Sequence, residues 1–431
     1  MNVVKYPKEE EWDVLLKRPV MNVETLRETV CKILADVKAE GDRAVKTYEK
    51  QFDKVELESL AVTREEMDEA ERLVSPELKA ALELAHENIR TFHAAQRFES
   101  HKVEVCPGVT CWQKSIPIEK VGLYIPGGTA PLFSTVLMLA TPAKIAGCRE
   151  IVLCTPPDRE GKVNPAILCA ARVAGVDRIF KAGGVQAIGA MAYGTETVPK
   201  VYKIFGPGNQ YVMAAKQQVS LHDVAIDMPA GPSEVAVMAD ATARPDFVAA
   251  DLLSQAEHGV DSQVLLVTTD EALLDKVQEE VERQLAVLPR KEIAGKALER
   301  SKLILVRDMD EALALVNRYA PEHLIIETAD YLQVAERVVN ARSVFLGSYT
   351  PESAGDYASG TNHTLPTNGY AMAYNGVNLD SYCRKVTFQE LAPQGVRAIG
   401  EAVACMAAGE HLDAHRNAMK LRMETIKDEV K

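Results

Sequence analysis

The first hundred residues place apolar side chains at intervals of three and four, with charged residues between them. This spacing is clear in ETLRETVCKILADVKAEGDRAVKTYEKQF and again from Pro76 to Phe98. Such a period puts the apolar side chains on one face of a helix. We therefore expect residues 1–100 to be helical, with residues 1–22 as a short N-terminal extension.

From Val121 the pattern changes to short apolar runs that alternate with Ala-rich helical segments. The first series contains VGLYI, EIVLC, RIFKAG and KIFGPG, each followed by a glycine or proline turn. A second series begins at Glu234 with EVAVMAD and continues through SQVLLVTTD, LILVRD, HLIIET and SVFLG. This alternation predicts βαβ units and parallel sheets. We expect an α/β protein with two Rossmann-like parallel-sheet domains that join near residues 230–234.

The expected domain boundaries follow from these two series. Residues 23–123, with the N-terminal helices, and residues 235–378 would form one discontinuous α/β domain, and residues 124–234 the other. Charged, Ala-rich sequence returns after about residue 380, so residues 379–431 are expected to form a helical tail. Its apolar positions need a partner, and a tail this long can pack on another subunit as easily as on its own.

One stretch, Gly347–Pro366, breaks the α/β pattern. Its sequence GSYTPESAGDYASGTNHTLP is rich in Gly, Pro, Ser and Thr, which favours a long loop over a regular helix or strand. Long ordered loops inside compact domains are often functional. Asp356 and His363 are the side chains in it that could carry chemistry.

Composition excludes several classes of protein. The 431 residues are 47% hydrophobic and 26% charged, as in ordinary soluble proteins, and the formal charge is -13. This acidity argues against nucleic-acid and anionic-membrane partners, which require clustered Lys and Arg. The N-terminus has no apolar signal-peptide core, and the most apolar region, residues 131–146, is too short and interrupted to span a membrane. Eight scattered cysteines without a CxxC pair indicate free thiols in a reducing cytoplasm.

A helix is predicted from Pro245 to a glycine stop at Gly259. Gln255 and His258 stand three residues apart on it, with Asp251 one turn earlier on the same side. Two interpretations remain open for this polar face. It can be solvated, which the spacing alone favours, or it can present Gln and His as a ligand pair.

Glu322 and His323 form the most suggestive of three Glu-His dipeptides, because they lie in a turn directly before an apolar strand. An adjacent carboxylate and imidazole can transfer protons near neutral pH. Adjacency of these residue types is also common by chance. On the C-terminal segment His411 and His415 stand four apart, as in half of a metal site, but the HExxH pattern of a zinc protease is absent.

Glycine-rich turns follow three strands of the first series, at residues 127–128, 183–184 and 206–208. Neither GxGxxG nor GxxxxGK[ST] occurs, so no nucleotide fingerprint is present. Each turn alone is consistent with a tight connection and no ligand. Together they favour a pocket at the carboxyl ends of the strands, where open α/β sheets bind ligands.

Several of these segments closely resemble the histidinol dehydrogenase family. The matching stretches run in family order from about Val121 to His415, and they are VGLYIPGGTAPLFSTVLMLATPAKIAG, AGGVQAIGAMAYGT, FGPGNQYVMAAK, DMPAGPSE, DLLSQAEHG, APEHL, SAGDYASGTNH and GEHLDAH. The resemblance implies a zinc enzyme that oxidises L-histidinol to L-histidine in two NAD-dependent steps through a bound aldehyde. It also implies one zinc ion per subunit and a cytoplasmic homodimer with shared active sites.

The resemblance assigns roles residue by residue, without a departure at any of these positions. Glu322 and His323 match the proton-transfer pair. The zinc ligands would be Gln255, His258 and Asp356, with His415 from the tail of the other subunit. Positions assigned to the cofactor NAD are Tyr124, Gln186 and Asn209. Substrate contacts would be Ser233, Gln255, His258, His323, Asp356, His363, Glu410 and His415.

These assignments imply a division of labour. Zinc would position the substrate's imidazole and amine, His323 would take the hydroxyl proton, and Glu322 would activate water onto the aldehyde. Three rivals are weaker. A related zinc and NAD enzyme could act on another small alcohol, and a covalent route through Cys111 or Cys148 lacks a His partner in sequence. A non-catalytic ligand-binding protein would not need the Glu-His pair.

Overall fold

The computed structural model describes residues 1–18, 23–127, 130–176, 178–229 and 231–428. The chain forms two compact units, each of which is described by itself. The first combines residues 1–95 with 118–381, and the second combines residues 96–117 with 382–431. The first unit contains two parallel sheets, which confirms the expected α/β class with parallel sheets.

The smaller parallel sheet has five strands in the order β6-β5-β4-β7-β8. Their bounds are β4 Lys120–Tyr124, β5 Glu150–Thr155, β6 Arg178–Lys181, β7 Lys203–Phe205 and β8 Ala225–Ile226. Strands β4 and β5 are buried along nearly their whole length. Burial on both faces explains why they appear in the sequence as continuous apolar runs.

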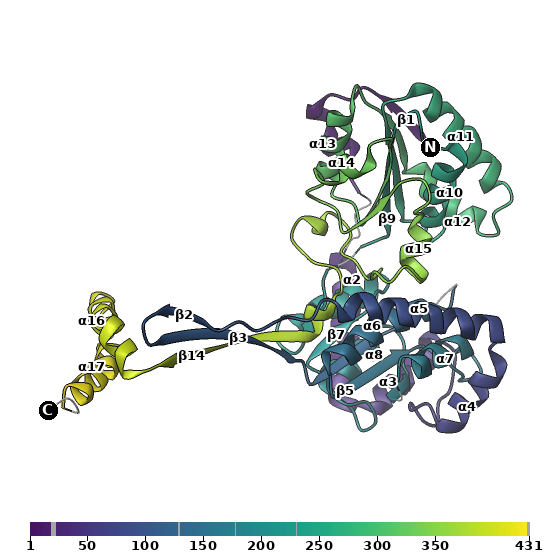
Figure 1. Ribbon diagram of the computed structural model, residues 1–431. Helices are drawn as coiled ribbons and strands as arrows, with labels where there is room; N and C mark the ends of the chain where they lie inside the picture. The colour runs from purple at the N-terminus through teal and green to yellow at the C-terminus, as the bar shows by residue number, and fades with distance from the viewer. Residues whose placement is uncertain (19–22, 128–129, 177, 230, 429–431) are drawn as a thin grey trace. The chain divides into compact units, whose positions relative to one another are not determined.

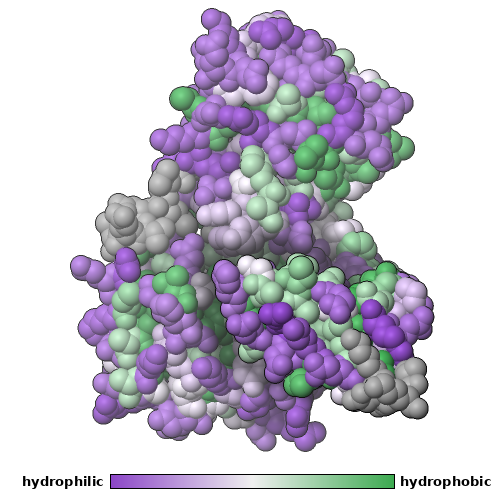
Figure 2. Space-filling model, turned by 90° about the vertical axis from the view of Figure 1, so that its left-hand side faces the viewer, coloured by the Kyte–Doolittle hydropathy of each residue, from purple (hydrophilic) through white to green (hydrophobic). Residues whose placement is uncertain are grey.

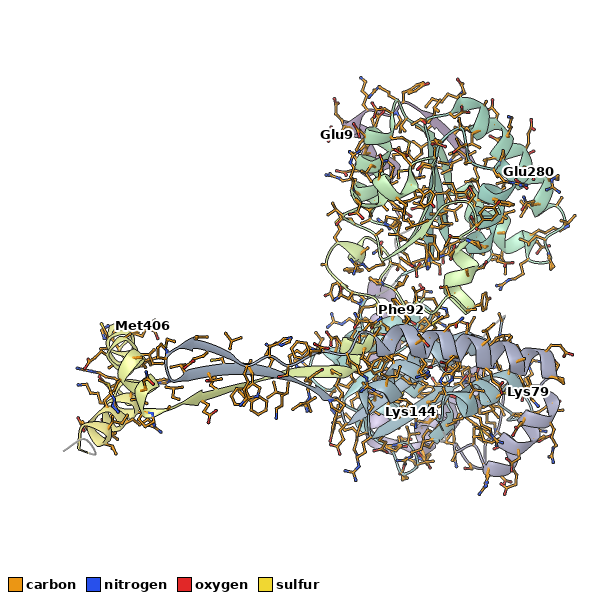
Figure 3. The ribbon with its side chains drawn as sticks, viewed as in Figure 1. Glu9, Lys79, Phe92, Lys144, Glu280 and Met406 are labelled. Carbon is orange, nitrogen blue, oxygen red and sulfur yellow. The ribbon has the colours of Figure 1, made fainter. Side chains whose placement is uncertain are left out.

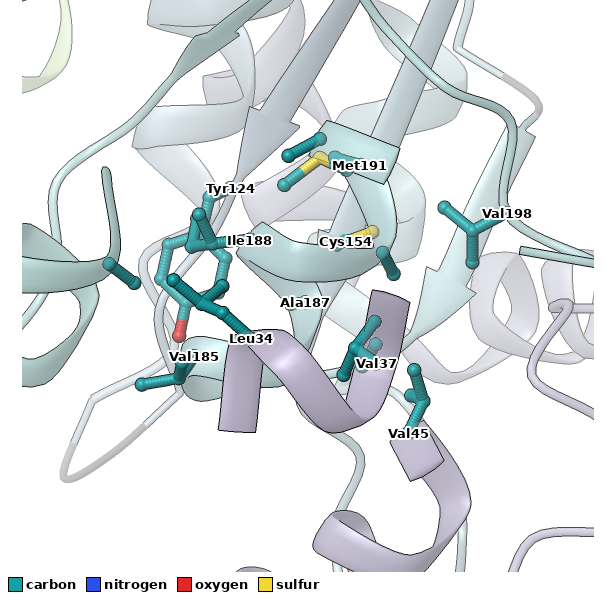
Figure 4. Packing of buried hydrophobic residues seen from close by; sticks show 14 of the residues in the cluster. Leu34, Val37, Val45, Tyr124, Cys154, Val185, Ala187, Ile188, Met191 and Val198 are labelled. Atoms are coloured by element: carbon teal, nitrogen blue, oxygen red, sulfur yellow. The ribbon is translucent and has the colours of Figure 1, made fainter. Parts of the chain in front are cut away.

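Helices cover this sheet in two groups. One group shares a hydrophobic cluster with the sheet and contains α2 Val23–Glu40, α3 Asp42–Phe52, α8 Gly184–Tyr193 and α9 Gln210–Ser220. The helices of the other group contact one another, and they are α4 Arg64–Leu73, α5 Pro76–Ala94, α6 Phe133–Ala146 and α7 Pro165–Val173. Figure 4 shows Leu34 of α2 beside Ile188 of α8, with Val37 further along α2. A Cβ at Gly189 would lie only 3.2 Å from Val37 Cγ1, so the glycine permits this close approach.

This arrangement differs from the expected grouping of residues 23–123 with residues 235–378. Val30, Val37 and Val45 lie in one cluster with Tyr124 and Val185, so the N-terminal helices cover the five-stranded sheet. The physical reason is that a parallel sheet must be covered on both faces, and α2 and α3 supply the apolar stripe that complements α8 and α9.

The larger parallel sheet has six strands in the order β1-β11-β10-β9-β12-β13. Their bounds are β1 Asn2–Lys5, β9 Glu234–Ala239, β10 Gln263–Thr268, β11 Lys302–Leu305, β12 His323–Glu327 and β13 Ser343–Leu346. The N-terminal extension, expected to be helical, thus supplies an edge strand. It pairs with β11 because NVVK is a short apolar run suited to a sheet edge.

Helices lie on both faces of the larger sheet (Figure 1). One face carries α10 Pro245–Ala256, α11 Glu271–Leu285 and α12 Lys291–Glu299. The other face carries α1 Trp12–Leu15, α13 Met309–Tyr319 and α14 Tyr331–Ala335. Short 3-10 turns occupy Glu9–Glu11, Tyr370–Met372 and Leu379–Tyr382.

The Gly347–Pro366 segment contains a helix that its composition did not predict, α15 at Glu352–Tyr357. The Asp251 carboxyl group accepts the backbone N–H of Glu352, which satisfies an orphan donor at the first turn of this helix. The remainder of the segment is irregular, as expected.

The second unit consists of a three-stranded antiparallel sheet followed by two helices. The strands are β2 Val103–Cys106, β3 Val109–Pro117 and β14 Cys383–Leu391, and the helices are α16 Pro393–Gly409 and α17 Asp413–Asp428. The expectation of a wholly helical tail was therefore wrong for Cys383–Leu391. Trp112 of β3 stacks on Phe388 of β14 with ring centroids 5.4 Å apart, a cross-strand pair that stabilises an extended segment.

Hydrophilic residues predominate on the face shown in Figure 2, in keeping with the charged composition. Within the described residues, every helix is too short or too polar to cross a membrane.

Candidate active site

The Glu-His turn lies at the amino end of β12. His323 is the first residue of this strand and pairs in register with Val235 of β9, which brings Glu322 next to Glu234. The Glu234 N–H donates to Glu322 Oε2 at 3.0 Å. Glu322 and His323 are only 6% and 3% exposed, so the predicted pair is a buried one rather than a surface dipeptide.

The His323 ring has a defined proton arrangement. Its Nδ1 lies 3.2 Å from the Glu234 carbonyl oxygen, which can only accept a hydrogen bond. Nδ1 therefore carries the proton, and Nε2 keeps a free lone pair. Burial lowers the pKa of His323 to about 4, with the negative charge of Asp356 acting in the opposite direction. The imidazole is thus neutral at pH 7 and can accept a proton at Nε2.

The pKa of the Glu322 carboxyl group is shifted in the opposite direction, upward. Burial raises its pKa well above the usual value, and the nearby charges of Glu234 and Asp356 raise it further. The hydrogen bond from the Glu234 N–H opposes this shift. The same surroundings therefore favour the neutral forms of both the acid and the imidazole, as desolvation does in catalytic pairs.

The structure brings two of the predicted metal ligands to His323. The side-chain amide of Gln255, at the end of α10, lies 3.2 Å from His323 Nδ1. Asp356 Oδ1 of α15 lies 3.8 Å from His323 Nε2. Ligand atoms of His323, Glu352 and Asp356 all lie within 4.8 Å of one another. Carboxylate and imidazole donors at this spacing can hold a divalent cation.

His258 lies just beyond the end of α10, and its side chain is exposed. Protein atoms nevertheless crowd the ring enough to lower its pKa by desolvation, while the charge of Asp356 acts to raise it. The Gln255 side chain, three residues earlier, is fully buried. The polar face predicted on this helix is therefore not simply solvated, because its members differ in exposure and face a carboxylate.

His363 is fixed beside Asp356 by two hydrogen bonds. Its Nδ1 donates to the Asp356 carbonyl oxygen at 2.8 Å, and its Nε2 accepts from Thr135 Oγ1 at 3.1 Å. Ser233 is half-buried and directly precedes Glu234 at the start of β9. Both predicted substrate contacts thus border the Glu322 and His323 pair.

Glu410 and His415 belong to the second unit, where both side chains are exposed at the junction of α16 and α17. Their assignment to a substrate contact and a zinc ligand stays a prediction.

Sequence reasoning missed Glu352 as a member of this group. Its side chain is 1% exposed, and its Oε1 lies 3.4 Å from His323 Nδ1. A signal was present, because Glu352 stands four residues before Asp356 and would share its face on a helix. Interpreting the segment as an irregular loop concealed that spacing.

The three residues assigned to the cofactor lie around the carboxyl ends of the five-stranded sheet. Tyr124 ends β4, and its hydroxyl accepts the Gly184 N–H at 3.0 Å. Gln186 is buried in the first turn of α8, and its Oε1 has no hydrogen-bond partner among the described residues. Asn209 caps α9 by accepting the N–H groups of Tyr211 and Val212. Gly128, in one of the predicted glycine turns, lies outside the described residues.

Glu49 of α3 is a second buried carboxyl group that the sequence did not single out. Its Oε1 accepts the Gly183 N–H and the Gln186 side-chain amide, both at 2.8 Å. Burial raises its pKa to about 7, and these two hydrogen bonds oppose the shift. Glu49 thereby ties α3 to the amino end of α8, where Tyr124 is also bound.

Comparisons with known proteins point to one family over nearly the whole chain. The family model described as histidinol dehydrogenase matches residues 16–423. The histidinol dehydrogenase of Bacteroides thetaiotaomicron is 71% identical over 427 residues, covering 99% of this chain and 100% of that protein. That of Salmonella typhimurium is 52% identical, covering 97% of this chain and 96% of its own length. The crystal structure of histidinol dehydrogenase from Elizabethkingia anophelis superposes with a TM-score of 0.97 at 52% identity, covering 99% of both chains.

Proposed function

The chain belongs to the histidinol dehydrogenase family. We propose that it carries out the NAD-dependent oxidation of L-histidinol to L-histidine at the Glu322 and His323 pair. The reaction, the last step of histidine biosynthesis, would proceed in two oxidations through a bound aldehyde. The observation that carries this assignment of residues is the buried, neutral imidazole of His323 beside the Glu322 carboxyl group.

The residues present fit a zinc ion. Gln255, His258 and Asp356 offer an amide, an imidazole and a carboxylate, and His415 from a second copy of the chain would complete the set. Support comes from the position of Gln255 and Asp356 on either side of His323 and from the influence of the Asp356 charge on His258. When bound there, zinc supplies an anchor for the imidazole and amine of the substrate.

Residues around Tyr124 fit a nicotinamide cofactor. The unpartnered Gln186 Oε1 can accept a hydrogen bond from a ligand, and a Cβ at Gly206 would overlap the Tyr124 carbonyl oxygen at 2.1 Å. The chain thus needs glycine where β7 turns toward Asn209. NAD, when bound, accepts the hydride of each oxidation.

The protein's own groups would act in sequence. His323 Nε2 takes the proton of the substrate hydroxyl in the first oxidation. The imidazolium returns this proton to the aldehyde oxygen while the Glu322 carboxyl group, in its ionised form, removes a proton from the water that adds to the aldehyde. His323, neutral again, then takes the hydroxyl proton of the resulting hydrate as the second hydride leaves. His363, which is fixed by Thr135 and the Asp356 carbonyl, would hold the substrate in position.

We also propose that the protein works as a cytoplasmic homodimer. The exposed positions of Glu410 and His415 in the second unit suit side chains that act in the site of a second copy.

The decisive measurement is the amount of NADH formed per L-histidinol consumed, with and without a chelator. We expect about two NADH per substrate with NAD in excess, since two hydrides leave one carbon. Chelation should abolish turnover, and added zinc should restore it. A single NADH per substrate, or full turnover in verified zinc-free protein, would contradict the proposal.

A further inference from the structure

Glu352 is a deeply buried carboxyl group in the candidate active site to which the proposed mechanism assigns no role. It is 1% exposed, and burial raises its pKa well above the usual value, as do Asp356, Glu322 and Asp251. A carboxyl group is rarely buried this deeply unless it is paired or performs a task. The Glu352 side chain is hydrogen-bonded to Ser254, and its Oε1 lies 2.6 Å from the Gln255 amide.

The two orientations of the Gln255 amide are not equivalent. With its nitrogen toward Glu352, that nitrogen donates to Glu352 Oε1 at 2.6 Å, and the amide oxygen accepts from Glu234 N and His323 Nδ1 at 3.1 and 3.2 Å. In the opposite orientation the nitrogen makes contacts of 3.2–3.5 Å, and two oxygens face each other across the short distance. The first orientation gains a short hydrogen bond.

The His323 proton supports the same choice independently. Because Nδ1 donates to the Glu234 carbonyl, it carries hydrogen, and the Gln255 atom that faces it should be an acceptor. Only the amide oxygen satisfies that condition. Two separate contacts, one on each side of the amide, therefore select one orientation.

We propose that Glu352 is a positioning residue that sets the orientation of the Gln255 amide. By accepting the hydrogen bond from the amide nitrogen, Glu352 keeps the amide oxygen on the side of His323, where that oxygen can ligate zinc in exchange for one of its two hydrogen bonds. This inference rests on the proposed zinc site. Glu352 acts only through Gln255 and does not itself contact the substrate.

The first test compares two substitutions of Glu352 by zinc competition with a chromogenic chelator. Glu352→Met keeps the length of the side chain but removes the acceptor, so zinc affinity should fall about 10- to 100-fold, as for other residues that orient a ligand. Glu352→Gln retains a carbonyl oxygen that can accept from Gln255, so zinc affinity should stay within about threefold of the parent. Equal loss in both variants would overturn the proposal and would point to the charge of Glu352 or to direct ligation.

The second test asks whether Glu352 acts through Gln255. In a Gln255→Ala background, Glu352→Met should cause no additional loss of zinc affinity, because no amide remains to be oriented. A full additional loss would overturn the proposal. If the parent protein itself binds no zinc, the proposed zinc site fails. If the parent binds zinc and Glu352→Met binds it equally well, only the role of Glu352 fails.

A matched control uses another buried carboxyl group on the six-stranded sheet. Glu327, on β12, is 2% exposed, and burial raises its pKa to about 7. Glu327→Met should lower the melting temperature much as Glu352→Met does, and it should leave zinc affinity unchanged. A loss of zinc affinity in this control would mean that removing any buried acid disturbs the site, and it would overturn the specific role of Glu352.

Discussion

Three buried carboxyl groups of this protein have a raised pKa in common and differ in the donor that each one faces. Glu322, Glu352 and Glu49 are all buried, and burial raises the pKa of each. Each also accepts or faces a specific donor, the Glu234 N–H, the Gln255 amide and the Gln186 amide respectively. Their roles therefore follow from the partner that each side chain holds, since desolvation is common to all three.

Glu322→Gln should separate the two oxidations. The glutamine oxygen can still accept the Glu234 N–H, so the local fold and oxidation of the alcohol should be largely retained. It cannot take a proton from water, so oxidation of supplied aldehyde should slow by about two to four orders of magnitude. Steady-state rates with L-histidinol and with the aldehyde would measure this difference, and an equal loss of both would contradict the division of labour.

Glu49→Gln should alter the dependence of stability on pH. The pKa of Glu49 is about 7 when folded and lower when unfolded, so its stabilising contribution is fully present below about pH 4.5 and is lost as pH rises through 7. Relative to the parent, the variant should therefore gain about 2–3 kcal/mol between pH 5 and pH 8.

Urea unfolding at the two pH values would measure this gain. The exposed Glu65→Gln serves as the control and should show a much smaller difference. A Glu49→Gln curve parallel to that of the parent would contradict the argument.

At the scale of elements, the site depends on how α15 lies against β13. Gly355 of α15 faces the Phe345 ring, where an added Cβ would come within 2.6 and 2.8 Å of two ring carbons. Phe345 is itself buried in the core of the larger sheet, so its ring has little room to move. Because α15 carries both Glu352 and Asp356, this contact sets their distance from His323.

Gly355→Ala should therefore weaken zinc binding and lower kcat by about tenfold or more, since a displaced helix misplaces two carboxylates. Gly295→Ala is the matched control, because this glycine of α12 has no atom within 4 Å of an added Cβ. The control should be stabilised by up to about 1 kcal/mol through helix propensity. Unchanged zinc affinity and kcat in Gly355→Ala would contradict the requirement for close packing.

The sequence was informative where a pattern is local. Apolar runs that alternate with helices predicted both parallel sheets, and the turn before an apolar strand predicted the Glu322 and His323 pair. It was uninformative where an element is stabilised by a residue or strand far away along the chain. Helix α15 is stabilised by the Asp251 carboxyl group, and β14 pairs with β3, far earlier in the chain. Neither partner can be inferred from local composition, and Glu352 was missed for the same reason.

At the scale of the whole molecule, the second unit draws on two distant segments of the chain. Its helices α16 and α17 contact each other, and Met423 lies against Gly400. Met406, labelled in Figure 3, is 68% exposed on α16, and Leu412 and Leu421 are also exposed. Exposed apolar residues on these two helices and at their junction are consistent with the proposed packing on a second copy of the chain.

Mixing two inactive variants tests the shared site. His258→Asn removes a ligand of the first unit, and His415→Asn removes one of the second. If each site combines the two units from different copies, random subunit exchange should restore about a quarter of the sites. Activity of the mixture, with exchange verified by mass labelling, would measure the recovery, and none after complete exchange would contradict a shared site.

The pairing of β14 with β3 also has a consequence for biosynthesis. The hairpin of β2 and β3 leaves the ribosome long before Cys383–Leu391 is translated, so its third strand arrives last. Until then Trp112 lacks the aromatic ring on which it stacks, and the free edge of β3 is open to β14 of a neighbouring nascent chain as well as to its own. Polysomes that hold several copies close together would thus favour assembly during translation.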